Sequence, residues 1–278
     1  MSTELNEIFN IANKTVLITG ATGFFGRHMS RSFIEAGAKV ILLGRSKKLL
    51  DQAADLSNRS NQSGVFAFQV DFYDQQELEK TLNKVIQKHS VDVLINNAFD
   101  FSKETGFNTP EGTIDKLTHK NWGKAFESGL YWAVKTTQVI GKQMQARRRG
   151  SIINISSMYG IVAPSPHLYA GTRFFNPPTY SVVKSGLIGL TRYTASFWGK
   201  YGIRCNAVLP GAFSNTESKG PNSVNPHNPF LKRLCKRTVL NRVGHPDDLR
   251  GLLIYLASDA SSYMTGQSII IDGGWTTT

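Results

Sequence analysis

Short apolar runs recur along this chain, and most of them precede a longer segment with helical periodicity. The apolar runs cover residues 14–19, 39–43, 65–71, 91–95, 151–157, 204–209 and 268–274. They are rich in Val, Ile and Leu and show little polar alternation, which is typical of strands buried on both faces of a sheet. Helical patterns are predicted up to Ala36 and over 75–89, 120–148 and 178–201, with another helix beginning at Pro246.

Strands that alternate with helices at this spacing predict parallel βαβ units with right-handed crossovers. We therefore expect an α/β fold, a Rossmann-like doubly wound parallel sheet flanked by helices on both faces. The 278 residues contain no repeat and no linker, so we predict a single domain spanning 1–278. Residues 212–241 show little periodicity and are rich in Ser, Asn, Pro and Lys, which is typical of a lid over the substrate site.

The chain has no apolar run of about 18 residues, the length a membrane-spanning helix needs, and its first residues are polar. We expect a cytoplasmic protein with no membrane partner. Two cysteines, Cys205 and Cys235, are too few for a disulfide framework, and no His/Cys spacing indicates zinc. No metal site is predicted.

The net charge of +12 raises the question of a polyanionic partner. The densest basic run, 147–149, lies where a predicted helix ends, and cations there complement the helix dipole. The other basic residues are not interleaved with aromatic residues, so no nucleic-acid partner is expected. An anionic small substrate or a phosphorylated cofactor explains the charge better.

A glycine-rich turn, Gly20-Ala21-Thr22-Gly23-Phe24-Phe25-Gly26, follows the first predicted strand and precedes a helix. In this context glycines let the backbone approach a pyrophosphate at the helix N-terminus. The second strand ends at Gly44, where an NAD-preferring site usually has an acidic residue, and Arg45 follows. Because an arginine accommodates a 2′-phosphate, we expect NADP(H) in preference to NAD(H). The alternative is that Arg45 and its neighbouring lysines are simply solvated in a loop.

Tyr180 and Lys184 lie four residues apart in a predicted helix, so their side chains share one face. A nearby ammonium group favours the phenolate form and would lower the pKa of the tyrosine. Taken alone, the pair also fits an ordinary amphipathic helix turn. Gly20, Asn97 and Ser157, however, all follow predicted strands, and ligands bind at that edge of a parallel sheet.

The order and spacing of these motifs resemble the short-chain dehydrogenase/reductase family over nearly the whole chain, in its short single-domain branch. The resemblance is carried by the 19–26 glycine turn, Asp71, Asn96-Asn97-Ala98, 154–157, Tyr180 with Lys184, Asn206 with Pro210-Gly211, 265–267 and 272–274. It implies that Tyr180 donates or accepts the proton, that Lys184 lowers the pKa of Tyr180 and holds the nicotinamide ribose, and that Ser157 binds the substrate oxygen. It also implies a homotetramer or homodimer.

The predicted cofactor-binding residues combine the glycine turn with the later strand ends. They are Gly20, Thr22, Gly23, Phe25, Gly26, Arg45, Asp71, Phe72, Asn97, Ala98, Tyr180, Lys184, Pro210, Gly211 and Phe213. Within this set the resemblance places Asp71 against adenine, Asn97 along the ribose path and the backbone near Phe213 against the carboxamide.

The chain departs from the family pattern in three places. The glycine spacing at 20, 23 and 26 follows the extended, sugar-nucleotide-modifying branch. Gly129 stands where the family has an asparagine that holds a proton-relay water, so water or Ser128 would have to rebuild the relay. The segment 158–179, between Ser157 and Tyr180, is longer than the family usually shows.

Because catalytic residues flank it, the 158–179 insertion should lie over or beside the substrate site. We hypothesise a substrate wall in which His167 or Arg173 meets an anionic or polyhydroxylated group. An oligomer contact or a surface elaboration is the alternative. The insertion looks like that of members associated with bacterial surface-sugar and flagellin-glycan synthesis and with gluconate-type dehydrogenases, which favours a sugar-derived substrate.

The leading prediction is an NADP-dependent oxidoreductase that interconverts a ketone and a secondary alcohol on a polar, sugar-like or phosphorylated compound. A 3-oxoacyl carrier-protein reductase is the second, because an acidic protein partner would also explain the basic charge. A third, motivated by Gly129, is a protein that binds NADP(H) with weak or no catalysis.

Overall fold

The computed structural model describes all residues except 1–2, 60–63, 173–174, 214–227 and 278. Within this part the strands form one seven-stranded sheet in the order β3-β2-β1-β4-β5-β6-β7, and every neighbouring pair is parallel. The strands are β1 (Thr15–Thr19), β2 (Lys39–Gly44), β3 (Val65–Gln69), β4 (Val93–Asn96), β5 (Gly150–Ile155), β6 (Ile203–Pro210) and β7 (Ser268–Ile271). The predicted fold class is confirmed.

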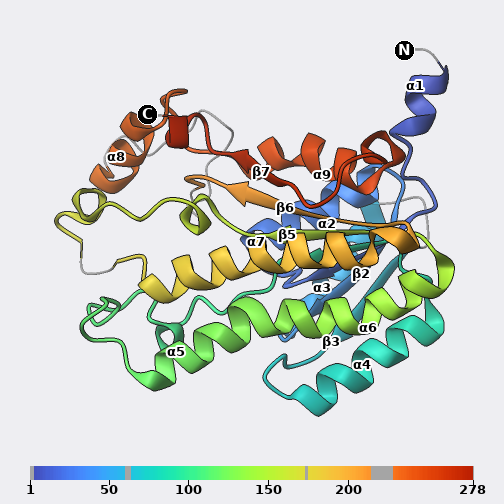
Figure 1. Cartoon of the computed structure of the whole chain (residues 1–278), viewed down its shortest axis with the longest axis horizontal. Helices are drawn as coiled ribbons and strands as arrows, with labels where there is room; N and C mark the ends of the chain where they lie inside the picture. The colour runs from blue at the N-terminus through green and yellow to red at the C-terminus, as the bar shows by residue number, and fades with distance from the viewer. Residues whose placement is uncertain (1–2, 60–63, 173–174, 214–227, 278) are drawn as a thin grey trace.

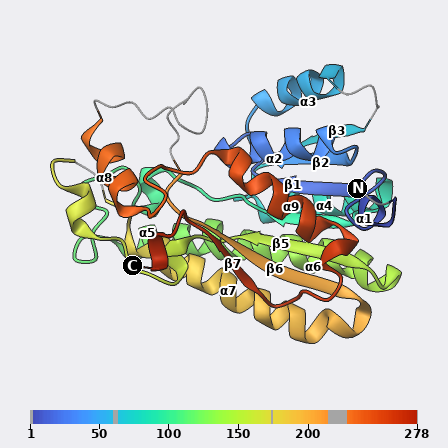
Figure 2. The same cartoon turned by 90° about the horizontal axis from the view of Figure 1, so that it is seen from above.

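Helices cover both faces of the sheet, as Figures 1 and 2 show. They are α1 (Thr3–Ile8), α2 (Phe24–Glu35), α3 (Lys48–Arg59), α4 (Gln75–Lys88), α5 (His119–Phe126), α6 (Trp132–Arg147), α7 (Pro178–Trp198), α8 (Pro229–Arg237) and α9 (Arg250–Ala257). Figure 1 shows α4, α6 and α7 side by side on one face, and Figure 2 shows α2 and α3 on the opposite side of the strands from α7.

The side chains of successive strand residues pack alternately into two hydrophobic cores, one on each side of the sheet. Val16 and Ile18 of β1 pack into the core that contains Phe33 of α2, whereas Leu17 packs into the core that contains Leu82 of α4. Side chains alternate between the faces of a strand, so a strand covered on both faces must be apolar throughout. This explains the uninterrupted apolar runs in the sequence.

The structure corrects two of the predicted segments. The helical stretch 120–148 is not one regular helix, because a π-helical turn, Glu127–Tyr131, separates α5 from α6. The predicted irregular segment 212–241 contains α8, which begins at Pro229 after the capping residue Asn228 and buries Leu231 and Leu234. Most of the remaining predicted lid, 214–227, lies outside the described residues.

None of the helices in the described part of the chain combines the length and apolar character that crossing a membrane requires.

Candidate active site

The glycine turn lies between β1 and α2 at the carboxyl edge of the sheet. Gly20 has a φ of +65°, which a side chain would strain, and a Cβ there would lie 2.9 Å from the Cα of Ala98. A Cβ at Gly26 would collide with the carbonyl oxygen of Gly20. Gly23 is the N-cap of α2 and has no side chain to cap the first turn. The backbone N–H groups of that turn therefore suit a pyrophosphate.

Thr19 and Asn97 fix this turn at the switch point of the sheet, where β1 lies beside β4. Thr19 Oγ1 accepts hydrogen bonds from the backbone N–H groups of Asn97 and Ala98, at 2.9 and 3.0 Å. Asn97 Nδ2 in turn donates to the carbonyl oxygens of Thr19 and Gly20, at 3.0 and 3.2 Å. The end of β4 therefore holds the glycine turn in place.

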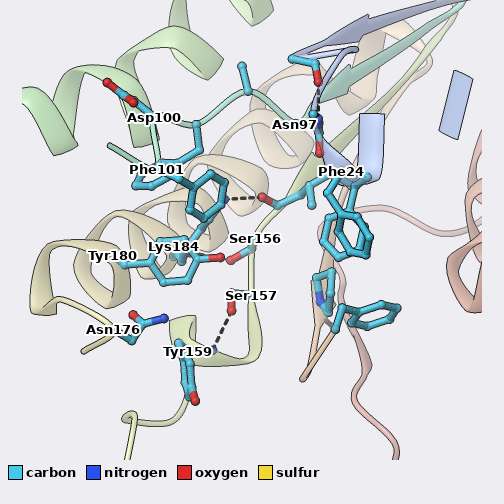
Figure 3. Close-up of a pocket in the computed structure, with 18 of the residues that line it drawn as sticks. Phe24, Asn97, Asp100, Phe101, Ser156, Ser157, Tyr159, Asn176, Tyr180 and Lys184 are labelled. Atoms are coloured by element: carbon cyan, nitrogen blue, oxygen red, sulfur yellow. Dashed lines mark hydrogen bonds between the residues drawn. The ribbon is translucent and has the colours of Figure 1, made fainter. Parts of the chain in front are cut away.

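The end of β5 and the start of α7 bring the predicted catalytic side chains together, as Figure 3 shows. Ser156 Oγ donates to the carbonyl oxygen of Lys184 at 2.7 Å, which ties α7 to β5. Ser157 Oγ accepts the backbone N–H of Tyr159 at 3.1 Å and is hydrogen-bonded to Tyr180. The Ser156 hydroxyl is therefore used within the protein backbone, whereas the Ser157 hydroxyl lies at Tyr180, which favours Ser157 for contact with a substrate oxygen.

Lys184 lies inside the protein, with 4% of its surface exposed. Its Nζ donates to the carbonyl oxygen of Ile155 at 2.8 Å and lies 5.4 Å from the ring centroid of Tyr180. Burial disfavours the ammonium form and lowers the pKa of Lys184 to about 7. The group can therefore lose or gain a proton near neutral pH.

Burial also acts on Tyr180, whose pKa is raised to about 12, while the hydrogen bond with Ser157 works in the opposite direction. This differs from the sequence-based expectation that Lys184 lowers the pKa of Tyr180. The reason is that the site removes both groups from water, which favours a neutral phenol and a neutral amine. Within the protein alone, Tyr180 is a proton donor.

The buried lysine predicts a pH-dependent gain in stability for Lys184→Met. The folded pKa of about 7 lies below the ordinary value of 10.5, so the cost of burying the ammonium is fully present below pH 7. This cost disappears as the pH rises towards 10.5. We expect the variant to raise the Tm by about 5 °C at pH 6. The gain in Tm should shrink clearly by about pH 9.5 in calorimetry; a gain independent of pH would contradict the argument.

One pocket contains most of the predicted cofactor and catalytic residues. Those lining it are Gly20, Thr22, Gly23, Phe25, Arg45, Phe72, Asn97, Ala98, Ser157, Tyr180, Lys184, Pro210, Gly211 and Phe213. Gly26 is not among them, because it packs behind the turn. Asp71 is also absent from the lining; its side chain is exposed and accepts the backbone N–H of Tyr73 at 3.0 Å.

Arg45 lies at the edge of the pocket, with 56% of its side chain exposed. Its Nη2 is 3.5 Å from Oδ1 of Asp100, a buried carboxylate that also accepts the Tyr73 hydroxyl at 2.8 Å. An arginine offers five donors, so this single contact leaves donors for a phosphate. The position fits the predicted binding of a 2′-phosphate.

The insertion contributes to the pocket through residues that sequence reasoning missed. Met158, Tyr159, Tyr169 and Asn176 line it, whereas His167 does not. His167 lies in a short 3-10 helix whose buried side chains are Leu168 and Tyr169, so it is exposed to solvent. The placement gives no support to His167 as a substrate contact, and Arg173 lies outside the described residues.

Most of the other missed lining residues are aromatic, while Gly44 and Asp100 adjoin predicted site residues or motifs and Leu234 belongs to α8. The missed residues are Phe24, Gly44, Phe99, Asp100, Phe101, Trp132, Phe230 and Leu234. Phe99 to Phe101 directly follow Asn96-Asn97-Ala98 at a strand end, which is the signal that could have found them.

Gly129 lies within the π-helical turn and against α7. A side chain there would collide with Val183, and its Cβ would lie 3.0 Å from Cε2 of Phe99. Ser128, the predicted substitute in the relay, donates its hydroxyl to the carbonyl oxygen of Lys124 at 2.8 Å. The space that a side chain at 129 would need is therefore filled by Val183 and Phe99.

The chain is similar to known proteins over nearly its whole length. Residues 20–276 match the family model described as enoyl-(acyl carrier protein) reductase. The chain is 29% identical to an NAD-dependent glycerol dehydrogenase of Listeria innocua over 96% of each chain. It is 31% identical to the sorbose reductase of Schizosaccharomyces pombe, covering 98% of this chain and 99% of the relative.

Solved structures show the same similarity. A gluconate 5-dehydrogenase of Burkholderia cenocepacia, in complex with NADP and tartrate, superposes with a TM-score of 0.80 at 26% identity and 99% coverage of both chains. The chain belongs to the short-chain dehydrogenase/reductase family. It is an NAD(P)-dependent oxidoreductase that acts on CH–OH groups.

Proposed function

We propose that this protein uses NADP(H) to interconvert a ketone and a secondary alcohol on a polar, sugar-like or phosphorylated substrate. The observation that carries the proposal is the convergence of Ser157, Tyr180 and Lys184 in the pocket that the glycine turn and Arg45 also line. Nicotinamide supplies the hydride when bound. The names of the relatives, which include sorbose reductase and 2-dehydro-3-deoxy-D-gluconate 5-dehydrogenase, support a polyhydroxylated substrate.

The protein's own part in ketone reduction is proton transfer and orientation. Tyr180, neutral at physiological pH, would donate its hydroxyl proton to the carbonyl oxygen as negative charge develops there. Ser157 would hydrogen-bond the same oxygen. The donated proton leaves a phenolate on Tyr180. Lys184, held by the carbonyl oxygen of Ile155, would stabilise this phenolate when the lysine is in its ammonium form.

The test is consumption of NADPH by the pure protein against keto-sugars, sugar phosphates and 3-oxoacyl thioesters, in parallel with Tyr180→Phe. We expect turnover of keto-sugars by the wild type that the variant largely loses. A preference for oxoacyl thioesters would instead favour the carrier-protein reductase. Tight NADPH binding without turnover in either direction would favour the binding protein.

Arg45→Ala is expected to weaken NADPH binding by about 10-fold or more, because a charged hydrogen bond to phosphate is lost. NADH binding should change less than about twofold, since NADH has no 2′-phosphate. Fluorescence titration of both cofactors measures this. Lys47→Ala, in the same loop, is the control; an equal loss in this variant, or an equal loss for NADH, would remove the assigned role of Arg45.

A homotetramer or homodimer remains a prediction. Exposed apolar side chains on α7 support it, since Val182, Tyr193 and Phe197 are 43%, 60% and 56% exposed. The apolar carboxyl-terminal segment 269–275 is a second candidate contact from the sequence; in it Trp275 is buried in its own chain, while Ile270 is 41% exposed.

A further inference from the structure

Three phenylalanines of the loop between β4 and α5 form an aromatic wall beside Tyr180. The wall consists of Phe99, Phe101 and Phe107, whose ring centroids lie 4.7 to 5.6 Å apart. All three rings contact Tyr180, at 5.3, 6.1 and 5.1 Å respectively. The wall therefore lies directly next to the proposed proton donor.

The wall has an inner and an outer part. Phe99 and Phe101 line the pocket, whereas Phe107 does not line it and packs against both of them. Phe101 is 54% exposed, although its neighbours Asp100 and Thr105 are buried. A large apolar ring left open beside a reacting group is available to contact a ligand.

Of the charged groups that line the described part of the pocket, Lys184 approaches the wall, with its Nζ 5.5 Å from the ring centroid of Phe99. Among the described residues that line the pocket, the charged ones are Arg45, Asp100 and Lys184. Arg45 and Asp100 face each other, and Lys184 donates to the carbonyl oxygen of Ile155. Figure 3 shows the Asp100 carboxylate pointing away from Tyr180, with Phe101 between them. Phe101 therefore presents an open apolar surface to the pocket, and Phe99 shares its surroundings with the buried Lys184.

Neutral polar groups from the insertion complete the surroundings of Tyr180. Tyr169 is hydrogen-bonded to both Tyr159 and Asn176, and burial raises the pKa values of Tyr159 and Tyr169, so both stay protonated. Figure 3 shows Asn176 near Tyr180 and Tyr159. A substrate here meets aromatic rings and neutral hydrogen-bonding groups together.

We infer that the substrate is a cyclic polyhydroxylated ketone or alcohol whose C–H-rich ring face lies on Phe99 and Phe101. Its reacting oxygen contacts Ser157, and its other hydroxyl groups contact the group formed by Tyr159, Tyr169 and Asn176. The inference rests on the proposed function and adds that the reacting carbon belongs to a ring. A ring buries its apolar face against the wall, which a short open chain does less well.

The experiment compares two neutral ketones as probes of the wall: inosose, a six-membered carbocyclic polyhydroxy ketone, and erythrulose, a ketotetrose that stays open-chain. Their dissociation constants are measured by calorimetry on the protein saturated with NADP⁺, which cannot reduce them, so the measurement does not depend on turnover. Phe101→Ala removes the exposed ring of the wall, and Phe9→Ala, a truncation at a ring that is 38% exposed near the N-terminus, is the control.

We expect Phe101→Ala to weaken inosose binding about fivefold and erythrulose binding less than twofold, with NADP⁺ binding unchanged. Phe9→Ala should change none of them. Equal effects on both ketones, no effect on inosose, or no measurable binding of inosose to the wild type would overturn the inference. Inosose binding that depends on Phe101, without NADPH oxidation by any ketone, would instead contradict the proposed function.

Discussion

Tyr180→Phe is expected to lower kcat for ketone reduction by about 10³-fold, because it removes the proton donor and leaves the ring. The ring keeps its contacts with Phe99 and Phe107, so the pocket should keep its shape. Steady-state consumption of NADPH measures the loss, and NADPH titration checks that the cofactor still binds.

Tyr193→Phe provides the matched control, since Tyr193 lies on the same helix and is 60% exposed away from the pocket. This variant should retain wild-type kcat. If Tyr180→Phe keeps kcat within about threefold of the wild type, Tyr180 is not the general acid and the assigned chemistry is wrong.

Gly129→Asn is expected to lower the free energy of unfolding by about 2–3 kcal/mol, through overpacking against Val183 and Phe99. It should also lower kcat rather than raise it, because the residues it displaces touch Tyr180 or its helix. Urea denaturation measures the stability change. The asparagine of the family pattern therefore cannot simply be restored.

The control for this prediction is Gly123→Asn, in α5, where a Cβ would have open space around it. It should change the stability by less than about 0.5 kcal/mol. Adding Val183→Ala to Gly129→Asn should recover part of the lost stability, since the two side chains compete for one space. A neutral Gly129→Asn, or an active site improved by it, would contradict the packing argument.

The fold was predictable because its signals are local. Buried strands such as β1 appear in the sequence as continuous apolar runs, and the glycines from Gly20 to Gly26 indicate a turn before a helix. The parallel sheet then brings its strand ends to one edge whatever the loops do, so Gly20, Asn97 and Ser157 could be grouped in advance. Their location in one pocket follows from topology.

What the sequence did not reveal depends on side-chain packing between distant segments. The residue pattern of the insertion could not show that Tyr169 turns inward and His167 outward, because one short 3-10 helix decides both. The direction of the pKa of Tyr180 depends on burial, which raises it and which only a structure shows. Gly129 could be noticed from sequence, but not its neighbours Val183 and Phe99.

The central claim is that hydride passes from NADPH to a ketone while Tyr180 donates the proton, and the most direct test follows the hydride itself. NADPH carrying deuterium at the transferable C4 position is incubated with the protein and a ketone that it turns over, and the product is examined by mass spectrometry and NMR. We expect one deuterium on the new carbinol carbon with the wild type, and a rate of transfer that falls sharply with Tyr180→Phe. Product without deuterium, or transfer equally fast in the variant, would contradict the claim.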